Sequence, residues 1–311
     1  MIACMADVVI MTEKSELFMT APFTADDKTA GAGTAENAAK SGVAAILAKD
    51  SDEAIAKAKQ LLSVLPANNL ETAGNDYYME NDAAVSADLK GIELINSVAD
   101  KESVIELYKQ FGTSAVTAIG SLNWRTAGFV ATNNGAKLTA DDSAKIARFV
   151  TLCDAYSIPV VTFVDSEGFE KSSAAELAGS IRDSAKLAQA YASATTAKIA
   201  VVTGKAYGSA YVALASTAAG SDFTFAWEGA VIAPTTPEAA VVFLNGVSED
   251  NAKQAQEYAD NEADAFTAAA NGYVYRVITA EDTKSALTSA IEATSSKRVV
   301  TPAKKHVNFV Y

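Results

Sequence analysis

Residues 198–216, KIAVVTGKAYGSAYVALAS, contain the pattern from which we predict the fold. The β-branched residues after Lys198 predict a buried strand, which we expect to break at Gly204. A turn with Gly208 and Ser209 follows, and small residues then open a helix. The first N–H groups of such a helix lack intrahelical acceptors and lie at the positive end of its dipole. The stretch therefore predicts a loop that can hold an anion, or an oxygen that becomes one during a reaction.

Composition and charge narrow the class of protein. Half of the 311 residues are hydrophobic, so the chain can bury one large core or two moderate ones. The net charge of −13 argues against nucleic-acid binding, and we expect the basic cluster Lys304, Lys305, His306 to be a solvated terminus. No apolar run reaches about 18 residues, and acids and lysine come too early for a signal peptide. We expect a cytoplasmic protein without membrane insertion.

The two cysteines also favour a cytoplasmic location. Cys4 and Cys153 show neither CxxC spacing nor the density of a disulfide scaffold, which suits a reducing compartment. Cys153 continues the apolar i, i+3, i+4, i+7 repeat that begins at Ile146 in a helix opened by the capping-box-like pattern at Thr139–Asp142. We expect both cysteines to be packing residues.

Strand and helix patterns alternate along the chain, which predicts an α/β fold with buried parallel strands. We expect strands over 7–11, 43–48, 115–122, 127–132, 159–165, 199–203, 222–227, 231–233 and 273–277. We expect helices over 34–41, 51–65, 100–111, 139–153, 173–194, 237–244, 249–259, 263–270 and 280–295. Residues around 123–125 suggest a hairpin, and the polar, aperiodic stretch 67–89 reads as a linker.

Two strand–loop–helix units are candidates for the site, VDSEGF at 164–169 and GKAYGSAY at 204–211. Adjacent parallel strands place both loops at one sheet edge, where their backbone N–H groups can converge on one oxygen. The alternative is that both are ordinary βα loops whose glycines serve only the turn. Spacing by itself favours that alternative.

Longer segments carry a family resemblance. Residues 147–169, 198–216, 222–244 and 298–309 resemble, in order, the second half of the carboxyltransferase subunits of biotin-dependent acyl-CoA carboxylases and their decarboxylase relatives. Residues 1–70, with LFMTAP, KSGVAAILAKD and LLSVLPANN, look like the end of the first half.

The resemblance implies a crotonase-like fold with residues 1–70 as the remnant of an N-terminal acyl-CoA domain, 71–90 as a linker and 91–311 as the carboxybiotin domain. The chain then opens about two thirds of the way through the first domain, without the glycine pair that would hold the acyl-CoA thioester oxygen. Such a chain would need another chain to supply the missing half.

The resemblance also implies the site. The family's YGGAY-type motif reads Tyr207-Gly208-Ser209-Ala210-Tyr211 here, with the backbone N–H groups of Ser209 and Ala210 as the oxyanion donors to the biotin ureido oxygen. A serine in place of the second glycine is tolerated if its φ is negative. The biotin-binding residues implied are Gly168, Phe169, Gly204, Tyr207, Gly208, Tyr211 and Val212. The position of Val212 also takes part in choosing the acyl-CoA.

Two departures from the family pattern concern loop rigidity. Glu167-Gly168 stands where a Pro-Gly is usual, and Glu228-Gly229 stands where a proline is usual.

For several other candidate residues we expect a capping or packing role. Asp165 is expected to cap the loop that follows it rather than act as a base, and Glu238 is expected to cap a helix. Trp227 is expected in the core, and Tyr207 and Tyr211 are as compatible with core packing as with biotin contact. The chain has one histidine, in the tail, so neither a Ser/His/Asp or Cys/His set nor a metal site is supported.

We therefore expect a carboxyltransferase component that moves a carboxyl group between carboxybiotin and an acyl-CoA. The biotin is held on a carrier protein and is not covalently bound to this chain. The expected partners are biotin carboxyl carrier protein, biotin carboxylase and further copies of this chain. One alternative is a biotin-dependent acyl-CoA decarboxylase subunit, which would associate with a membrane decarboxylase complex. Another is a non-catalytic biotin-carrier-binding or assembly protein.

Overall fold

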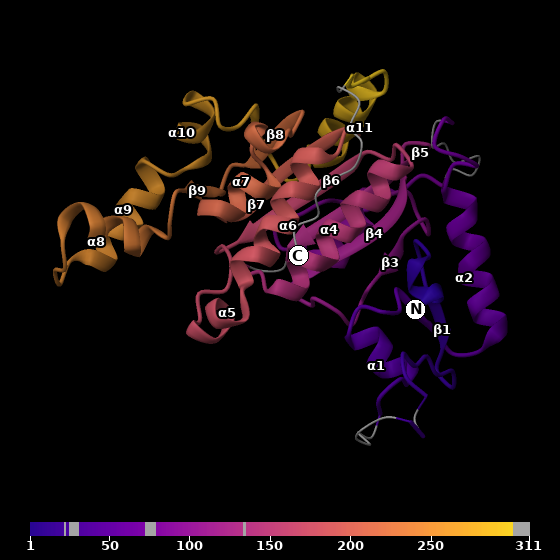
Figure 1. Ribbon diagram of the computed structural model, residues 1–311. Helices are drawn as coiled ribbons and strands as arrows, with labels where there is room; N and C mark the ends of the chain where they lie inside the picture. The colour runs from indigo at the N-terminus through magenta and orange to yellow at the C-terminus, as the bar shows by residue number, and fades with distance from the viewer. Residues whose placement is uncertain (22, 25–30, 72–78, 133–134, 301–311) are drawn as a thin grey trace.

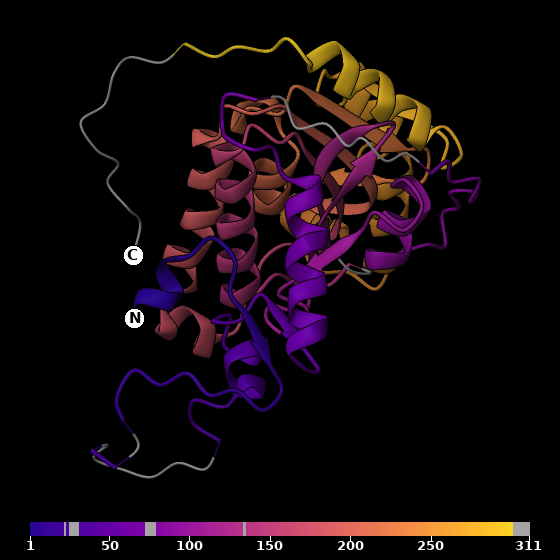
Figure 2. The same ribbon diagram turned by 90° about the vertical axis from the view of Figure 1, so that its right-hand side faces the viewer.

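The structure, a computed structural model, describes residues 1–21, 23–24, 31–71, 79–132 and 135–300. Its main body is an eight-stranded sheet with helices on both faces (Figures 1 and 2). The path of the sheet is β10 (Arg276–Ile278), β8 (Phe223–Trp227), β7 (Lys198–Tyr207), β6 (Val160–Ser166), β5 (Arg125–Thr132), β4 (Ala115–Leu122) and β3 (Ile105–Leu107), with β9 (Val231–Ala233) paired to the end of β7. Strands β5 to β10 run parallel, and β4 and β3 continue the sheet antiparallel. The α/β class predicted from the sequence is confirmed.

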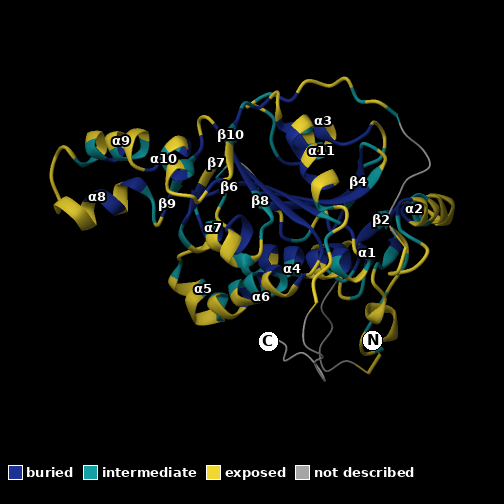
Figure 3. Cartoon of the chain, turned by 90° about the horizontal axis from the view of Figure 1, so that it is seen from above, coloured by how far each residue is buried: buried dark blue, intermediate teal, exposed yellow. Residues whose placement is uncertain are grey.

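The central strands are buried on both faces, as their apolar runs predict. In β6, Val160 and Val164 pack in one cluster with helices α4 (Ala140–Ala155) and α6 (Ser180–Ser193). Val161 and Phe163 pack in another, with α3 (Gly91–Val98) and α11 (Thr283–Thr294). Successive strand residues point to opposite faces, so one apolar run fills two cores. Figure 3 shows this buried sheet between helices whose outer sides are exposed.

The remaining elements flank the sheet. They are the 3-10 turns at Ile2–Met5 and Thr217–Ala219, strands β1 (Ile10–Thr12) and β2 (Ile46–Ala48), and helices α1 (Ala35–Lys40), α2 (Ser51–Val64), α5 (Ser173–Ala178), α7 (Gly208–Leu214), α8 (Pro237–Asn245), α9 (Asn251–Asn261) and α10 (Ala265–Ala270). Helices α8 and α9 pack on each other and project from the body as an arm (Figures 1 and 3).

The N-terminal unit, which consists of β1, α1, β2 and α2, resembles the C-terminal end of the chain, from β8 to α11, in its topology. Strands β1 and β2 pair in parallel and are connected through α1. Strands β8 and β10 also pair in parallel, and they are connected through β9, α8, α9 and α10. An isolated antiparallel bridge joins Glu16 to Thr34, the N-cap of α1, and an equivalent bridge joins Val231 to Asp264, the N-cap of α10. Helices α2 and α11 then follow the second strand of each pair. The two ends of the chain are thus built on a similar plan.

The helix predicted over residues 100–111 is wrong. Helix α3 ends at Val98, and β3 occupies Ile105–Leu107 as an edge strand. Ile105 and Leu107 are buried while Glu106 between them is partly exposed, which is the period-two pattern of a strand. Asp100 does not open a helix, because its carboxylate is bonded to the β4–β5 turn.

The long helix predicted over 173–194 is divided. Gly179 has a φ of 84° and separates α5 from α6. A residue in this left-handed conformation ends a helix, and glycine adopts it without a Cβ clash. The break lets α6 alone pack against α4, while the residues of α5 stay largely exposed.

Several local predictions are confirmed. Strands β4 and β5 form the predicted hairpin, and α2 ends before Pro66. The capping box of α4 is present at Thr139 and Asp142, and Cys153 is fully buried. The prediction for Cys4 is wrong, because it is exposed in a 3-10 turn that contains no buried residue.

Two predictions lie partly or wholly outside the described residues. These are the basic tail at 304–306 and the middle of the linker, 72–78. The linker's second half packs on the body through buried Val85, and the Asn81 amide donates to the Ala99 carbonyl at 2.6 Å. Within the described ranges, no helix combines the length and apolar character needed to cross a membrane.

Lys145 is buried in the core, where its ammonium donates to the carbonyls of Gly112 (3.2 Å) and Ala115 (2.7 Å). Burial lowers its pKa to about 8, against the partly compensating charges of Asp142 and Glu106. Because the unfolded chain keeps the proton up to a higher pH, the burial cost is present below pH 8 and is relieved as pH rises.

We therefore expect the unfolding free energy of the wild type, relative to Lys145→Met, to rise by about 1 kcal/mol between pH 7 and pH 9. Urea unfolding of both proteins at the two pH values measures this difference, with Lys57→Met as a control on a partly exposed lysine. A difference that stays constant with pH would contradict a depressed pKa for Lys145.

Candidate active site

The strand of the opening stretch does not break at Gly204, contrary to the prediction. Strand β7 continues to Tyr207, and its pairing with β6 shifts register. Val164 pairs with Val202 but Ser166 pairs with Ala206, so two steps along β6 correspond to four along β7. Gly204 lies in this bulge, where a Cβ would stand 2.4 Å from Oδ1 of Asp165. Gly204 is therefore a close-packing glycine and not a turn glycine.

The sharp turn lies at Gly208, which has a φ of 56° and whose absent Cβ would lie 3.0 Å from the Pro234 carbonyl oxygen. Helix α7 begins there, so the amides of its first three residues have no acceptor one turn earlier in the helix. Ser209 is not among the residues with positive φ. This meets the condition under which serine replaces a glycine at this position. Strand, turn and helix start are thus confirmed, with the strand ending at Tyr207 instead of breaking at Gly204.

The two predicted loops line one hollow of about 630 Å³. The first loop contributes Glu167, Gly168 and Phe169, and the second contributes Tyr207, Gly208 and Ser209. Gly168 has a φ of 105°, and a Cβ there would be 3.7 Å from the Tyr207 carbonyl oxygen, so the two backbones lie side by side. Parallel pairing of β6 and β7 brings the loops to the same sheet edge.

Most of the predicted site residues surround this hollow. Gly168, Phe169, Tyr207, Gly208, Ser209 and Val212 line it. Ser209 and Val212 are exposed, whereas the side chain of Ala210 is fully buried beneath the first turn of α7. Gly204, Ala210 and Tyr211, which were also predicted for the site, are not among the lining residues.

The tyrosines of the motif stay protonated near neutral pH. The hydroxyl of Tyr211 donates to the Tyr273 carbonyl at 2.7 Å, and burial raises its pKa to about 12. Burial also raises the pKa of Tyr207, which packs with Ala233 and Ala263. Neither phenol suits the role of a base, which leaves the backbone amides and the exposed Ser209 hydroxyl as the chemical groups that the motif offers to the hollow.

Asp165 does not cap its own loop, contrary to the prediction. Its Oδ1 accepts the amide of Lys205 on β7 at 2.9 Å, and its Oδ2 lies 3.2 Å from Nζ of Lys90. The side chain of Lys205 extends to Glu167, with 2.6 Å between Nζ and Oε1, and this hydrogen bond raises the pKa of Lys205. Two ion pairs therefore lie at the end of β6, one buried and one at the rim of the hollow.

The prediction that Trp227 lies in the core is confirmed, whereas the prediction that Glu238 caps a helix is wrong. Glu238 lies in the first turn of α8, while Thr236 is the N-cap, with Oγ1 accepting the Ala239 amide at 3.4 Å. Trp227 is buried, and its indole N–H donates to Oγ1 of Thr283 at 2.9 Å. Among the described residues, which exclude His306, no group of three or more His, Cys, Asp or Glu could hold a metal ion.

One wall of the hollow was not predicted. It consists of Ile181, Ser184, Ala185 and Ala188 on α6, opposite Pro234 and Thr235 before α8. The four α6 residues follow the i, i+3, i+4, i+7 spacing of one helix face, so the signal was present in the sequence. Which helix faces the loops, however, depends on tertiary packing.

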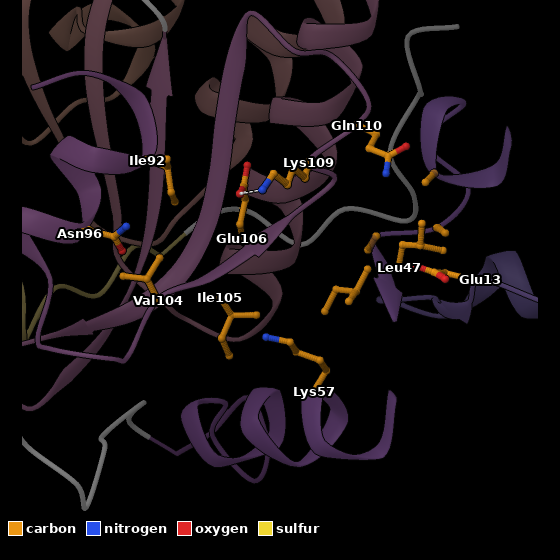
Figure 4. A pocket seen from close by; sticks show the side chains of 14 residues that line it. Glu13, Leu47, Lys57, Ile92, Asn96, Val104, Ile105, Glu106, Lys109 and Gln110 are labelled. Carbon is orange, nitrogen blue, oxygen red and sulfur yellow. Dashed lines mark ion pairs between the residues drawn. The ribbon is translucent and has the colours of Figure 1, made fainter. Parts of the chain in front are cut away.

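A second hollow, of about 400 Å³, lies between the N-terminal unit and the edge of the main sheet (Figure 4). Consecutive residues of β2 and β3 line it, including Ile46, Leu47 and Ile105, and Lys109 lies 3.9 Å from Glu106 at its rim. It includes none of the residues predicted for the site. The amide-bearing hollow beside α7 is therefore the candidate active site.

The chain is similar to known carboxyltransferase and decarboxylase subunits. The chain is 35% identical to the methylmalonyl-CoA carboxyltransferase 12S subunit of Propionibacterium freudenreichii subsp. shermanii, over 98% of this chain and 64% of that protein. It is 32% identical to the methylmalonyl-CoA decarboxylase subunit alpha of Veillonella parvula, again over 98% and 64%. The chain thus spans just under two thirds of the length of these relatives.

A solved structure agrees over the same extent. The transcarboxylase 12S hexamer, with methylmalonyl-CoA and methylmalonic acid bound, superposes with a TM-score of 0.91 at 34% identity, covering 99% of this chain and 65% of that one. This confirms the predicted crotonase-like fold and the resemblance to carboxyltransferase subunits. The family model described as the carboxyl transferase domain matches residues 2–309, and the chain belongs to this family.

Proposed function

We propose that the chain is a carboxyltransferase component that moves a carboxyl group between carboxybiotin on a carrier protein and an acyl-CoA. The observation that carries this proposal is the first turn of α7, where Gly208 and Ser209 line the hollow and the amides of Ser209 and Ala210 have no intrahelical acceptor, in a member of this family. Preorganised amide donors stabilise an oxygen on which charge develops, and removing one typically costs about 2.7–4 kcal/mol of transition-state stabilisation.

The hollow fits a biotin head group. Its volume of about 630 Å³ lies in the range of small-molecule sites, and Phe169, Ile181 and Val212 supply apolar walls. Gly208 is necessary for this shape, because a Cβ would approach the Pro234 carbonyl. Carboxybiotin, when bound, supplies the carboxyl group as CO2. The role of Ser209 and Ala210 is to hold the ureido oxygen, and Gly168, Phe169, Tyr207 and Val212 position the ring.

For the domain organisation we propose residues 1–70 as part of an acyl-CoA domain, 71–90 as the linker and 91–311 as the carboxybiotin domain. The similar plan of the two ends supports this division, since β1–α1–β2–α2 has the order of β8–α10–β10–α11, with β9, α8 and α9 inserted between β8 and α10. Gly204 and Tyr211 act in this proposal from behind the hollow, by shaping β7 and fixing α7.

The direction of transfer has two candidates. The carboxyltransferase relative favours exchange between two carboxyl carriers, whereas the decarboxylase relative favours removal of a carboxyl group from an acyl-CoA onto biotin. Backbone amides serve both directions, because each passes through the same oxyanion. The exposed Val212 is the residue of the hollow that we assign to acyl-CoA choice.

The purified chain, with and without a second chain that supplies an acyl-CoA domain, is mixed with biotinylated carrier protein and with methylmalonyl-CoA labelled in its free carboxyl group, and this mixture tests the proposal. Label arriving on the carrier is the expected result. Carrier binding without transfer would favour the assembly-protein alternative. Absence of both binding and transfer would overturn the proposal. Adding biotin carboxylase, ATP and labelled bicarbonate with propionyl-CoA then measures the opposite direction.

We also propose that the chain assembles with copies of itself through the arm, as the similar 12S subunit forms a hexamer. Helix α8 and the loop that follows it expose Phe243 (89%), Leu244 (62%) and Val247 (89%), an apolar group of the kind that marks an interface.

We expect Phe243→Glu to lower the mass measured by light scattering to that of a smaller species. Ile55→Glu, at a half-exposed position on α2 at the other side of the molecule, is the control and is expected to leave the mass unchanged (Figure 1). An unchanged mass for Phe243→Glu would show that the arm is not the contact.

A further inference from the structure

Asp165 holds a buried carboxylate at the junction of three parts of the chain. The residue is 7% exposed, and both carboxylate oxygens have partners. Oδ1 accepts the Lys205 amide at 2.9 Å, and Oδ2 lies 3.2 Å from the ammonium of Lys90, which precedes α3. A buried charge is stable only when paired and hydrogen-bonded, and this arrangement supplies both.

The backbone of Asp165 is fixed independently of its side chain. Its amide donates to Oγ1 of Thr132 on β5 at 2.7 Å, and its carbonyl accepts the Gly135 amide at 2.9 Å. The carboxylate is therefore carried by a rigid strand position and does not depend on β7 for its own placement.

The hydrogen bond between the Lys205 amide and the Asp165 carboxylate lies within the bulge of β7, close to the turn at Gly208. Between Val202 and Ala206 the strand bulges away from regular pairing with β6, so the ladder does not supply the usual acceptors there. The Asp165 carboxylate accepts the Lys205 amide in this gap and fills the space that Gly204 leaves free. Gly208, where the chain turns into α7, comes only three residues later.

The second link between the strands is weaker. Lys205 and Glu167 are 47% and 33% exposed, so water screens their ion pair, and exposed pairs contribute little. The buried carboxylate is the link able to hold the bulge in one conformation.

We propose that Asp165, neutralised by Lys90, is a positioning residue that fixes the β7 bulge and so aims the Ser209 and Ala210 amides into the hollow. The inference rests on the proposed function for its effect on catalysis, but its effect on the backbone can be measured separately. Asp165 touches no reacting atom in this proposal and acts through Lys205.

We call the contacts of the Asp165 carboxylate with the Lys205 amide and with Lys90 the Asp165 clamp, and two variants separate its hydrogen bond from its charge. Asp165→Ala removes the acceptor, whereas Asp165→Asn keeps a carbonyl oxygen for the Lys205 amide and loses the charge. Asp100→Asn is the matched control, because Asp100 is also a buried carboxylate that accepts a backbone amide, from Asn123 at 3.0 Å, but it lies at the β4–β5 turn.

The first measurement is hydrogen exchange by mass spectrometry in a peptide covering 203–211. We expect exchange at least tenfold faster in Asp165→Ala, less than threefold faster in Asp165→Asn and unchanged in Asp100→Asn. Unchanged exchange in Asp165→Ala would overturn the proposal, whether or not the wild type transfers a carboxyl group.

The second measurement is steady-state carboxyl transfer at a temperature where all variants are folded. We expect kcat at least tenfold lower in Asp165→Ala, with KM within twofold, recovery to within threefold of wild type in Asp165→Asn, and wild-type kcat in Asp100→Asn. Wild-type kcat in Asp165→Ala would overturn the positioning role. An inactive wild type with the expected exchange pattern would instead refute the proposed function and leave the clamp standing.

Discussion

Replacing Ser209 by proline is expected to lower kcat for carboxyl transfer by about 100-fold, because it removes one of the two amides assigned to the ureido oxygen. Proline lacks the N–H group, but the first turn of a helix tolerates it since no intrahelical bond is lost there. The side chain of Ser209 is exposed and makes no core contact that the substitution would destroy. Steady-state transfer assays of the folded variant measure the effect.

The control is Ser209→Ala, which keeps the amide and the Cβ and is expected to retain kcat within threefold. Circular dichroism melting of both variants checks that the fold is intact. If Ser209→Pro is folded and transfers carboxyl groups at the wild-type rate, the amide of residue 209 is not a donor in the reaction.

Asp100→Ala is expected to lower the free energy of unfolding by about 3 kcal/mol. The carboxylate is buried and accepts from Oγ of Ser121 at 2.6 Å and from the amides of Asn123 and Trp124 at 3.0 and 3.3 Å. The two turn residues have φ values of 49° and 69°, a conformation that costs energy without glycine. Asp100 offsets this cost, and its loss leaves buried donors at a strained turn.

Urea unfolding monitored by fluorescence measures the change. Asp100→Asn keeps one acceptor oxygen and is expected to cost about 1 kcal/mol. A loss below about 1 kcal/mol in Asp100→Ala would mean that the turn keeps its conformation without the carboxylate.

Local patterns predicted most of the elements because their physical causes are local. The capping box at Thr139 and the acids that open α2 satisfy helix amides within a few residues, so they can be read directly. The apolar run of β6 likewise predicts burial wherever the strand lies. The prediction failed at 100–111 because Ile105 and Leu107 form a three-residue edge strand, too short for its period to stand out.

In the candidate site, too, the features with local causes were predicted and those that depend on tertiary packing were not. The YGSAY motif predicted the turn and the helix start, and the family resemblance proposed the amides of Ser209 and Ala210 as donors and biotin as their ligand. The clamp by Asp165 was not predicted, because Lys90 is 75 residues away in sequence and the Lys205 contact depends on strand register. The α6 wall also depends on packing, since its helical period names a face but not the neighbour of that face.

By itself, the sequence determined the alternation of strands and helices, the family, and the residues of the two loops, because propensity, capping and motif spacing act over a few residues. Only the tertiary structure decided that β7 bulges through Gly204, that Asp165 fixes the bulge, and that α6 closes the hollow. Those features arise from side chains distant in sequence that compete for the same buried space. Their geometry is therefore a property of the packed molecule and not of any single stretch.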